Sequence, residues 1–203
     1  MFDSDLDRKR TLPSSKFSRR TFLATSASAL AGVALWSVRR PRAVQATTSP
    51  GSSQKVEIVQ FSDAGQRLGV VSVSKVVKTD DQWRQQLSGN AFDITRHADT
   101  EMAFTGKHWN LHEKGLYRCI CCDNALFSAE TKFDSGTGWP SFWDPIARQN
   151  VQTIEDSSYF VARTAVSCTE CDAHLGHVFD DGPAPTHLRY CMNSASLRFV
   201  KQA

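Results

Sequence analysis

The chain has 203 residues, of which 40% are hydrophobic and 22% charged, a composition typical of a soluble globular protein with one ordinary domain plus an extension. The net charge is +3, but nine of the 24 basic and three of the 21 acidic residues lie at positions 1–46, so the remaining chain has a net charge of −3. Binding to a phosphate backbone usually requires clustered Lys and Arg, so nucleic acid is not an expected partner.

The first 46 residues are predicted to be a signal peptide of the twin-arginine type. A polar, basic stretch ends at Arg20, an apolar stretch of small residues follows over 22–38, and Ala46 is a suitable last residue before cleavage. Arg19 and Arg20 stand at the junction, as in the twin-arginine consensus. We therefore expect export to the periplasm or an equivalent compartment.

A membrane anchor is the alternative interpretation of the same segment, in which the signal stays uncleaved. Its apolar stretch has about 17 residues, whereas a spanning helix needs ~20. The arginines that follow it keep this alternative open: Arg39, Arg40 and Arg42.

Two parts of the chain show strand signals. Within an extension over 47–75, made of a linker and a hairpin, apolar runs begin at Val56 and Val70 on either side of the turn-like Asp63-Ala64-Gly65. From His108 onward, short runs rich in Tyr, Phe, Val and Ile alternate with Gly, Pro, Asp and Asn. This pattern predicts antiparallel β structure.

A helix is predicted between these two parts. Thr79 and Gln82 form a capping-box pattern, and the helix should end near Ser88-Gly89. Apolar residues near helical spacing are Trp83, Leu87 and Phe92.

Four of the six cysteines form two Cys-x-x-Cys pairs, Cys119/Cys122 and Cys168/Cys171, with 45 residues between the pairs. Two such turns supply the tetrahedral set of four thiolates that Zn²⁺ prefers, and a site closed in this way is structural rather than catalytic. The zinc would cross-link distant parts of a sheet. A pair of disulfides is the alternative, because export leads to an oxidising compartment.

The other two cysteines are Cys121 and Cys191. Cys121 lies between two predicted ligands and is interpreted as a spectator. Cys191 lies in a strand-like alternation over 187–199, where Arg189 and Asn193 would share its face. A guanidinium nearby favours the nucleophilic thiolate. From the residues alone, a small buried core cysteine remains the alternative.

Several motifs occur in order between Val76 and Phe199: Thr100-Glu101, Phe104-Thr105-Gly106, Tyr117-Arg118-Cys119, Phe133-Asp134-Ser135-Gly136, Gly138-Trp139-Pro140-Ser141-Phe142, Cys171-Asp172-Ala173-His174-Leu175-Gly176-His177-Val178-Phe179 and Arg189-Tyr190-Cys191-Met192-Asn193-Ser194. Together they resemble the B-type methionine sulfoxide reductases, which reduce methionine-R-sulfoxide. The resemblance implies an all-β reductase domain over 76–203, with two antiparallel sheets, short N-terminal helices and a four-cysteine zinc site remote from the chemistry.

The resemblance also implies roles for individual residues. Cys191 would be the nucleophile and His177 its acid/base partner, while His174 and Asn193 would hold the sulfoxide oxygen and the polar network. Without the resemblance, the histidines would equally fit a second metal site or plain packing. The implied substrate-binding residues are Trp139, whose ring would receive the substrate methyl group, Thr100 and Arg189. Trp139 would otherwise be an ordinary core residue.

One position departs from the pattern of many relatives. They carry a resolving cysteine where this chain has Thr137, and threonine cannot form a disulfide. Attack by Cys191 would leave a sulfenic acid, which another thiol must reduce. Cys121 or a small thiol are alternatives, but an external thioredoxin-like reductant is expected, because rotation of Cys121 would disturb the zinc ligands.

The expected substrates are oxidised proteins or peptides, and the expected oligomeric state is a monomer. A zinc-stapled binding module is the rival class of function. It is disfavoured because such a module needs no reactive thiol beside an acid.

Overall fold

The computed structural model describes residues 54–156 and 163–202. The predicted signal peptide and most of the linker lie outside the described residues. Within these ranges, no helix is long and apolar enough to cross a membrane. The described chain contains two helices and three antiparallel sheets, of two, six and three strands.

The predicted N-terminal hairpin is confirmed. Strand β1 (Lys55–Phe61) pairs with β2 (Arg67–Ser74) around the turn that contains Gly65. Its strands bury Ile58 and Val59 against the rest of the protein, at 4% and 1% exposure. The hairpin is therefore packed onto the domain that follows it.

The capping box at Thr79 is also confirmed, because the Thr79 side chain accepts from the backbone N–H of Gln82 and the Gln82 side chain accepts from the N–H of Thr79. Helix α1 (Asp80–Gln86) ends before Ser88, as predicted. Phe92 was wrongly placed with this helix. Ser88 caps a second helix, α2 (Gly89–His97), and Phe92 belongs to that one.

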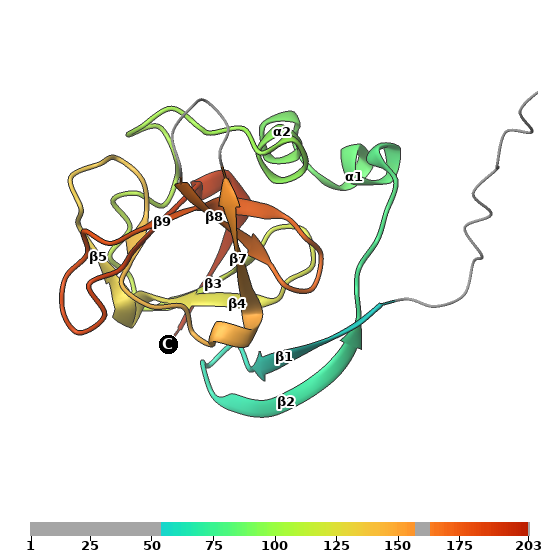
Figure 1. Cartoon of the computed structure of the whole chain (residues 1–203), viewed down its shortest axis with the longest axis horizontal. Coiled ribbons are helices and arrows are strands. Elements are labelled where there is room, and N and C mark those ends of the chain that lie inside the picture. The colour runs from blue at the N-terminus through green and yellow to red at the C-terminus, as the bar shows by residue number, and fades with distance from the viewer. Residues whose placement is uncertain (1–53, 157–162, 203) are drawn as a thin grey trace, which may run out of the picture. The chain divides into compact units, whose positions relative to one another are not determined.

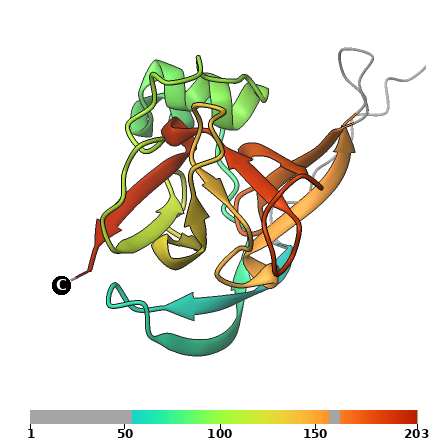
Figure 2. The ribbon, with the colours of Figure 1, turned by 90° about the vertical axis from the view of Figure 1, so that its left-hand side faces the viewer.

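The predicted all-β domain with two antiparallel sheets is confirmed. The three-stranded sheet has the order β11-β3-β4 and the six-stranded sheet the order β5-β6-β10-β9-β8-β7. The helices lie on one side of these sheets and the hairpin β1–β2 on the opposite side (Figure 1, Figure 2). The strands are β3 (Gly115–Cys119), β4 (Ala125–Ser128), β5 (Lys132–Phe133), β6 (Ser141–Phe142), β7 (Val151–Asp156), β8 (Arg163–Cys168), β9 (His174–Phe179), β10 (Arg189–Met192) and β11 (Leu197–Lys201).

Aromatic side chains from both large sheets fill the core. Phe127 of β4 stacks on Phe142 of β6 with ring centroids 4.5 Å apart, and Tyr117 of β3 meets Phe142 edge-on at 4.9 Å. All three side chains are completely buried. Offset and edge-to-face pairs add to the free energy gained from burial, so this cluster holds the two sheets together.

The strand expected over 187–199 is interrupted. After β10 the chain leaves the six-stranded sheet at Asn193, passes through a 3₁₀ turn (Ser194–Ser196) and enters the three-stranded sheet as β11. The apolar residues change phase at this break, from even positions up to Met192 to odd positions from Leu197, so a single strand over 187–199 was wrong. Cys191 is therefore on β10, whereas Asn193 is in the crossover between sheets.

Candidate active site and metal centre

Each Cys-x-x-Cys pair forms the turn of a hairpin, one in each of the two large sheets. In the β3–β4 turn, the N–H of Asp123 donates to the carbonyl of Cys119 at 2.9 Å, and in the β8–β9 turn the N–H of Asp172 donates to the carbonyl of Cys168 at 2.9 Å. Asp123 and Asp172 both have positive φ, 69° and 55°. The two turns therefore share one backbone conformation, which directs both sulfurs of a pair to the same side.

The four sulfurs meet at one point between the sheets. All lie within 4.8 Å of one another, with 3.6 Å between Cys119 Sγ and Cys171 Sγ and 3.5 Å between Cys122 Sγ and Cys168 Sγ. A tetrahedral ion with metal–sulfur bonds of about 2.3 Å would place its sulfurs about 3.8 Å apart. The residues present therefore fit a single metal ion, and the pairing is across the sheets rather than within each turn.

Cys121 points to the helix side of this cluster. It is 4% exposed, and its thiol neighbours are Thr95 and Arg96 of α2 together with the cluster sulfurs. Gln86 also donates a hydrogen bond to the Cys121 carbonyl at 2.7 Å. This environment is that of a packed core residue.

A separate pocket of about 130 Å³ lies on the six-stranded sheet. Cys191 of β10 stands directly opposite His177 of β9, and cross-strand partners of this kind project from the same face. Five residues predicted for the site line this pocket: Cys191, His177, Asn193, Trp139 and Thr100.

The Cys191 sulfur lies in a partly buried environment with several polar neighbours. Burial raises the pKa of its thiol above the usual value, whereas the Thr137 hydroxyl, the Arg189 guanidinium and the Ser141 hydroxyl all lower it. The predicted influence of Arg189 thus has the expected sign, but burial outweighs it. Strand β10 packs closely against β9 at Gly176, which has φ +156°. A Cβ at this position would lie 2.1 Å from the Cys191 carbonyl oxygen.

The two histidines of β9 have different surroundings. His177 Nε2 lies 3.0 Å from a carboxylate oxygen of Asp156, which also pairs with Arg163 at 3.2 Å. His174 does not line the pocket; its ring centroid is 5.2 Å from that of His177. Burial, and next the proximity of His177, lower the pKa of His174 to about 4. His174 is therefore neutral at physiological pH.

Trp139 and Asn193, on two sides of the pocket, are both held by the backbone of Glu101. The Trp139 indole N–H donates to the Glu101 carbonyl at 3.0 Å, and the Glu101 N–H donates to Asn193 Oδ1 at 3.0 Å. The Asn193 amide also donates to the Leu175 carbonyl at 3.2 Å. Both ends of this amide are thus engaged with backbone groups.

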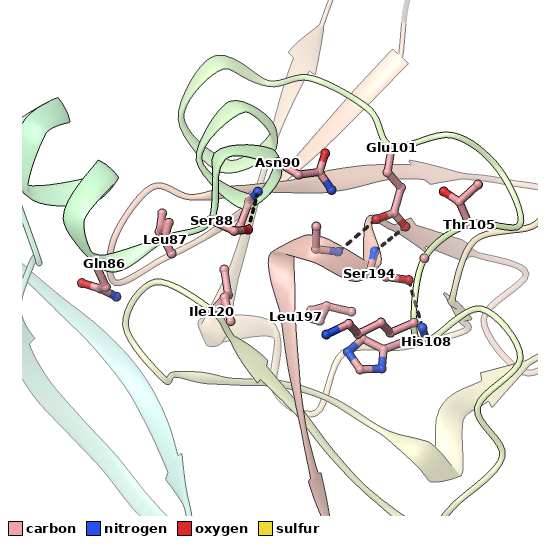
Figure 3. Close-up of a pocket in the computed structure, with 14 residues that line it drawn as sticks. Gln86, Leu87, Ser88, Asn90, Glu101, Thr105, His108, Ile120, Ser194 and Leu197 are labelled. Atoms are coloured by element: carbon pink, nitrogen blue, oxygen red, sulfur yellow. Dashed lines mark hydrogen bonds between the residues drawn. The ribbon is translucent and has the colours of Figure 1, made fainter.

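The Glu101 side chain fixes the crossover that follows Cys191. Its carboxylate accepts from the N–H groups of Ser194 at 2.6 Å and Ala195 at 3.0 Å. Figure 3 shows these bonds among the residues that line a second pocket, of about 440 Å³. In the same view, the Ser194 hydroxyl accepts from the N–H of His108 at 3.1 Å. One buried carboxylate therefore joins the loop after α2 to the crossover beside Cys191.

Arg189 does not line the pocket. Its guanidinium forms a bidentate ion pair with Asp181, at 2.8 and 2.9 Å, and lies 4.3 Å from the ring centroid of Phe179. It influences Cys191 both as a nearby charge and through a side-chain hydrogen bond.

Sequence reasoning missed several functional neighbours. Arg163 and Phe179 line the pocket, Asp156 holds His177, and Glu101 holds two pocket residues. Glu101 and Phe179 stand inside motifs quoted above, so a signal existed for them. Arg163 and Asp156 belong to no motif and are brought in by the pairing of β7 with β8.

Comparison with known proteins gives the family of this chain. The SelR domain family matches residues 87–201. The chain is 55% identical over 125 residues to the peptide methionine sulfoxide reductase MsrB of Herminiimonas arsenicoxydans, covering 62% of this chain and 91% of that protein. It is 52% identical over 127 residues to MsrB of Hahella chejuensis (63% and 91%), and 54% identical over 123 residues to the chloroplastic peptide methionine sulfoxide reductase B1 of Oryza sativa (61% and 58%). The chain belongs to the B-type peptide methionine sulfoxide reductases, a family of oxidoreductases.

Proposed function

We propose that the protein reduces the R epimer of protein-bound methionine sulfoxide through a sulfenic acid on Cys191. The observation that carries this proposal is the direct pairing of Cys191 with His177 in a small pocket that Trp139 lines. A pocket of about 130 Å³ accommodates the end of one side chain, while the rest of a protein substrate stays outside.

The chemistry needs a nucleophile and a proton donor together. The Cys191 thiolate attacks the sulfoxide sulfur while the sulfoxide oxygen takes up a proton, since this sulfur is a poor electrophile until then. His177 is the proposed donor, held in place by Asp156 at 3.0 Å. Oxygen passes to Cys191, which becomes a sulfenic acid, and the substrate leaves as methionine.

Recycling is assigned to an external dithiol of the thioredoxin type. Two thiols reduce the sulfenic acid to the Cys191 thiol, release water and become a disulfide. Thr137 supplies no thiol, and Cys121 is enclosed between α2 and the cysteine cluster. Arg189 and His174, which do not line the pocket, act through their influence on Cys191 and His177.

Separated sulfoxide epimers provide the test. The mature domain with dithiothreitol should reduce a peptide containing methionine-R-sulfoxide and leave the S epimer unchanged, and Cys191→Ser should abolish turnover. Cys121→Ser is the matched control and should retain activity. Turnover by the Cys191 variant, or equal reduction of both epimers, would contradict the proposal.

The ion proposed for the four-cysteine cluster is one structural Zn²⁺. Four thiolates are a soft, closed donor set that leaves no position for substrate. When bound, the ion would supply a cross-link between the sheets, and its binding free energy would add to folding.

Export through the twin-arginine route is the proposed localisation, on the basis of the N-terminal sequence alone. That route carries folded proteins, so the metal could be acquired before export. Lys substitution at both Arg19 and Arg20 should leave the precursor in the cytoplasm, as measured by fractionation. If the variant still reaches the far side of the membrane, general secretion or an anchor replaces this proposal.

A further inference from the structure

Thr137 is in direct contact with the proposed nucleophile. The loop 134–138 between β5 and β6 brings Thr137 Oγ1 to 3.8 Å from Cys191 Sγ, a distance at which a hydroxyl can donate a hydrogen bond to sulfur. Glycines with left-handed φ stand on both sides of Thr137, Gly136 at +71° and Gly138 at +86°. A Cβ on Gly138 would lie 2.7 Å from the backbone nitrogen of Phe104, so this loop geometry is tightly specified.

Two more hydroxyls extend this contact away from Cys191. Ser135 Oγ lies 2.8 Å from Thr137 Oγ1 and 2.7 Å from Ser141 Oγ, and Ser141 Oγ lies 3.2 Å from the Trp139 carbonyl oxygen. Ser141 is completely buried and stands directly opposite Cys191, on β6. Thr137 and Ser141 thus lie beside the sulfur, and Ser135 joins their two hydroxyls.

Each hydroxyl has one proton to donate, so the network has two arrangements. Ser141 Oγ is closer to Ser135 Oγ than to the Trp139 carbonyl oxygen, 2.7 Å against 3.2 Å, and when Ser141 donates its proton to Ser135, Ser135 can donate to Thr137. The Thr137 hydroxyl proton is then available for Cys191. In the opposite arrangement Thr137 donates to Ser135, which leaves the sulfur without a hydroxyl donor from this residue.

We propose that Thr137 is a catalytic residue whose hydroxyl donates a hydrogen bond to the Cys191 thiolate, with Ser135 as a positioning residue that holds the hydroxyl in this orientation. The proposal rests on the proposed function, because it needs Cys191 as the nucleophile. It assigns to Thr137 a role in the reduction of the sulfoxide. At this position many relatives have a cysteine that acts in the next step, the reduction of the sulfenic acid.

Other groups around Cys191 also influence its ionisation. On β10 Arg189 favours the thiolate, although its ion pair with Asp181 reduces this effect. His177 faces the sulfur from β9, backed by Asp156, and β6 contributes only Ser141. Arg163 on β8 also lines the pocket and pairs with Asp156, and Asp134 on the loop is exposed. The guanidinium that influences the sulfur, Arg189, is paired with Asp181, so a direct hydroxyl donor matters.

Alkylation of Cys191 as a function of pH tests the proposal without requiring turnover. Iodoacetamide labelling of the full mature protein should be followed at the Cys191 peptide by mass spectrometry. Thr137→Val should raise the apparent pKa of Cys191 by about one unit, which is about tenfold less thiolate at neutral pH. Thr137→Ser should restore the wild-type profile, because it restores the hydroxyl.

The matched control is Thr153→Val, the same change on the exposed edge strand β7, which should leave the profile unchanged. In sulfoxide reduction with dithiothreitol, Thr137→Val should lower kcat about tenfold at neutral pH with little change in KM, and the loss should shrink as pH rises.

An alkylation profile of Thr137→Val that matches the wild type would overturn the role of Thr137, even if Cys191→Ser is inactive and the proposed function stands. If Thr137→Val does not fold, the alkylation profile of Ser135→Ala tests the proposal instead, because this variant keeps the Thr137 hydroxyl but removes its hydrogen-bond partner. A smaller shift in the same direction supports the proposal and no shift overturns it. Turnover by Cys191→Ser would instead refute the proposed function itself.

Discussion

Replacing Glu101 with glutamine should destabilise the protein and slow its turnover. The Glu101 carboxylate is 8% exposed and accepts backbone hydrogen bonds from Ser194 and Ala195, at 2.6 and 3.0 Å. Its own backbone groups hold Asn193 and Trp139. A change at this side chain therefore affects the crossover after Cys191 and the pocket together.

The expected loss of stability follows from the two bonds. Hydrogen bonds to a charged group contribute about 1.5–3 kcal/mol each. Glutamine keeps one acceptor oxygen and turns an NH₂ group toward the other N–H, so one bond is lost and one is weakened. We expect a loss of about 2–3 kcal/mol, which for a domain of this size lowers the Tm by roughly 4–12 °C.

Urea unfolding and steady-state reduction of the R epimer, both measured far below the Tm, provide the assay. A displaced crossover should lower kcat/KM by about tenfold or more, because catalysis is sensitive to small errors in position. Glu113→Gln is the matched control. Glu113 pairs with Lys201 at the surface, where both side chains are about half exposed or more, so its loss should cost less than about 1 kcal/mol.

Two results would refute this reasoning. Equal stability of the Glu101 and Glu113 variants would show that the carboxylate does not hold the crossover. A large loss of stability with unchanged kcat/KM would show that Glu101 supports the fold without positioning the pocket.

Three other predictions concern the cysteines and His174. Metal analysis of protein purified from the cytoplasm should find one zinc per chain, and Cys168→Ser should unfold at much lower urea; a zinc-free protein with two disulfides would contradict this. The folded pKa of His174 is depressed to about 4, so the unfolded state binds more protons between pH 6.5 and 4, and stability should fall by up to about 3 kcal/mol as pH drops through that window. His174→Gln should flatten this dependence in urea unfolding at pH 7, 5.5 and 4.5, and an unchanged slope would count against it. Peptide mapping after one equivalent of sulfoxide should find Cys121 free, whereas a Cys121–Cys191 disulfide would make Cys121 the resolving thiol.

Features determined by nearby residues were predictable from the sequence. The capping box at Thr79 depends on a spacing of three residues, and each Cys-x-x-Cys turn is closed by bonds within five residues. The motifs placed Cys191, His177 and Trp139 in one site through a family resemblance, and the structure brings these residues to one pocket.

Features that depend on tertiary contacts were not predictable in this way. Glu101 and Asn193 are 92 positions apart, and only the folded chain joins them. The apolar residues change phase between β10 and β11, but only the folded chain shows that the two strands belong to different sheets. Arg189 has the right spacing for the site, but Asp181 and Phe179 compete for its guanidinium.

The N-terminal hairpin has a consequence for shortening the chain. Asn150 is completely buried; its side chain accepts from the Val59 N–H at 2.7 Å and donates to the Val59 carbonyl at 2.8 Å, and an ion pair joins Lys75 to Asp172 beside the cysteine cluster. A protein cut at residue 87, where the family match begins, would lose these partners. The buried amide would then have to be rehydrated or left with unmade bonds, at about 1–3 kcal/mol for each group. A shortened protein that keeps these contacts should therefore begin before residue 55, more than thirty residues before the start of the family match.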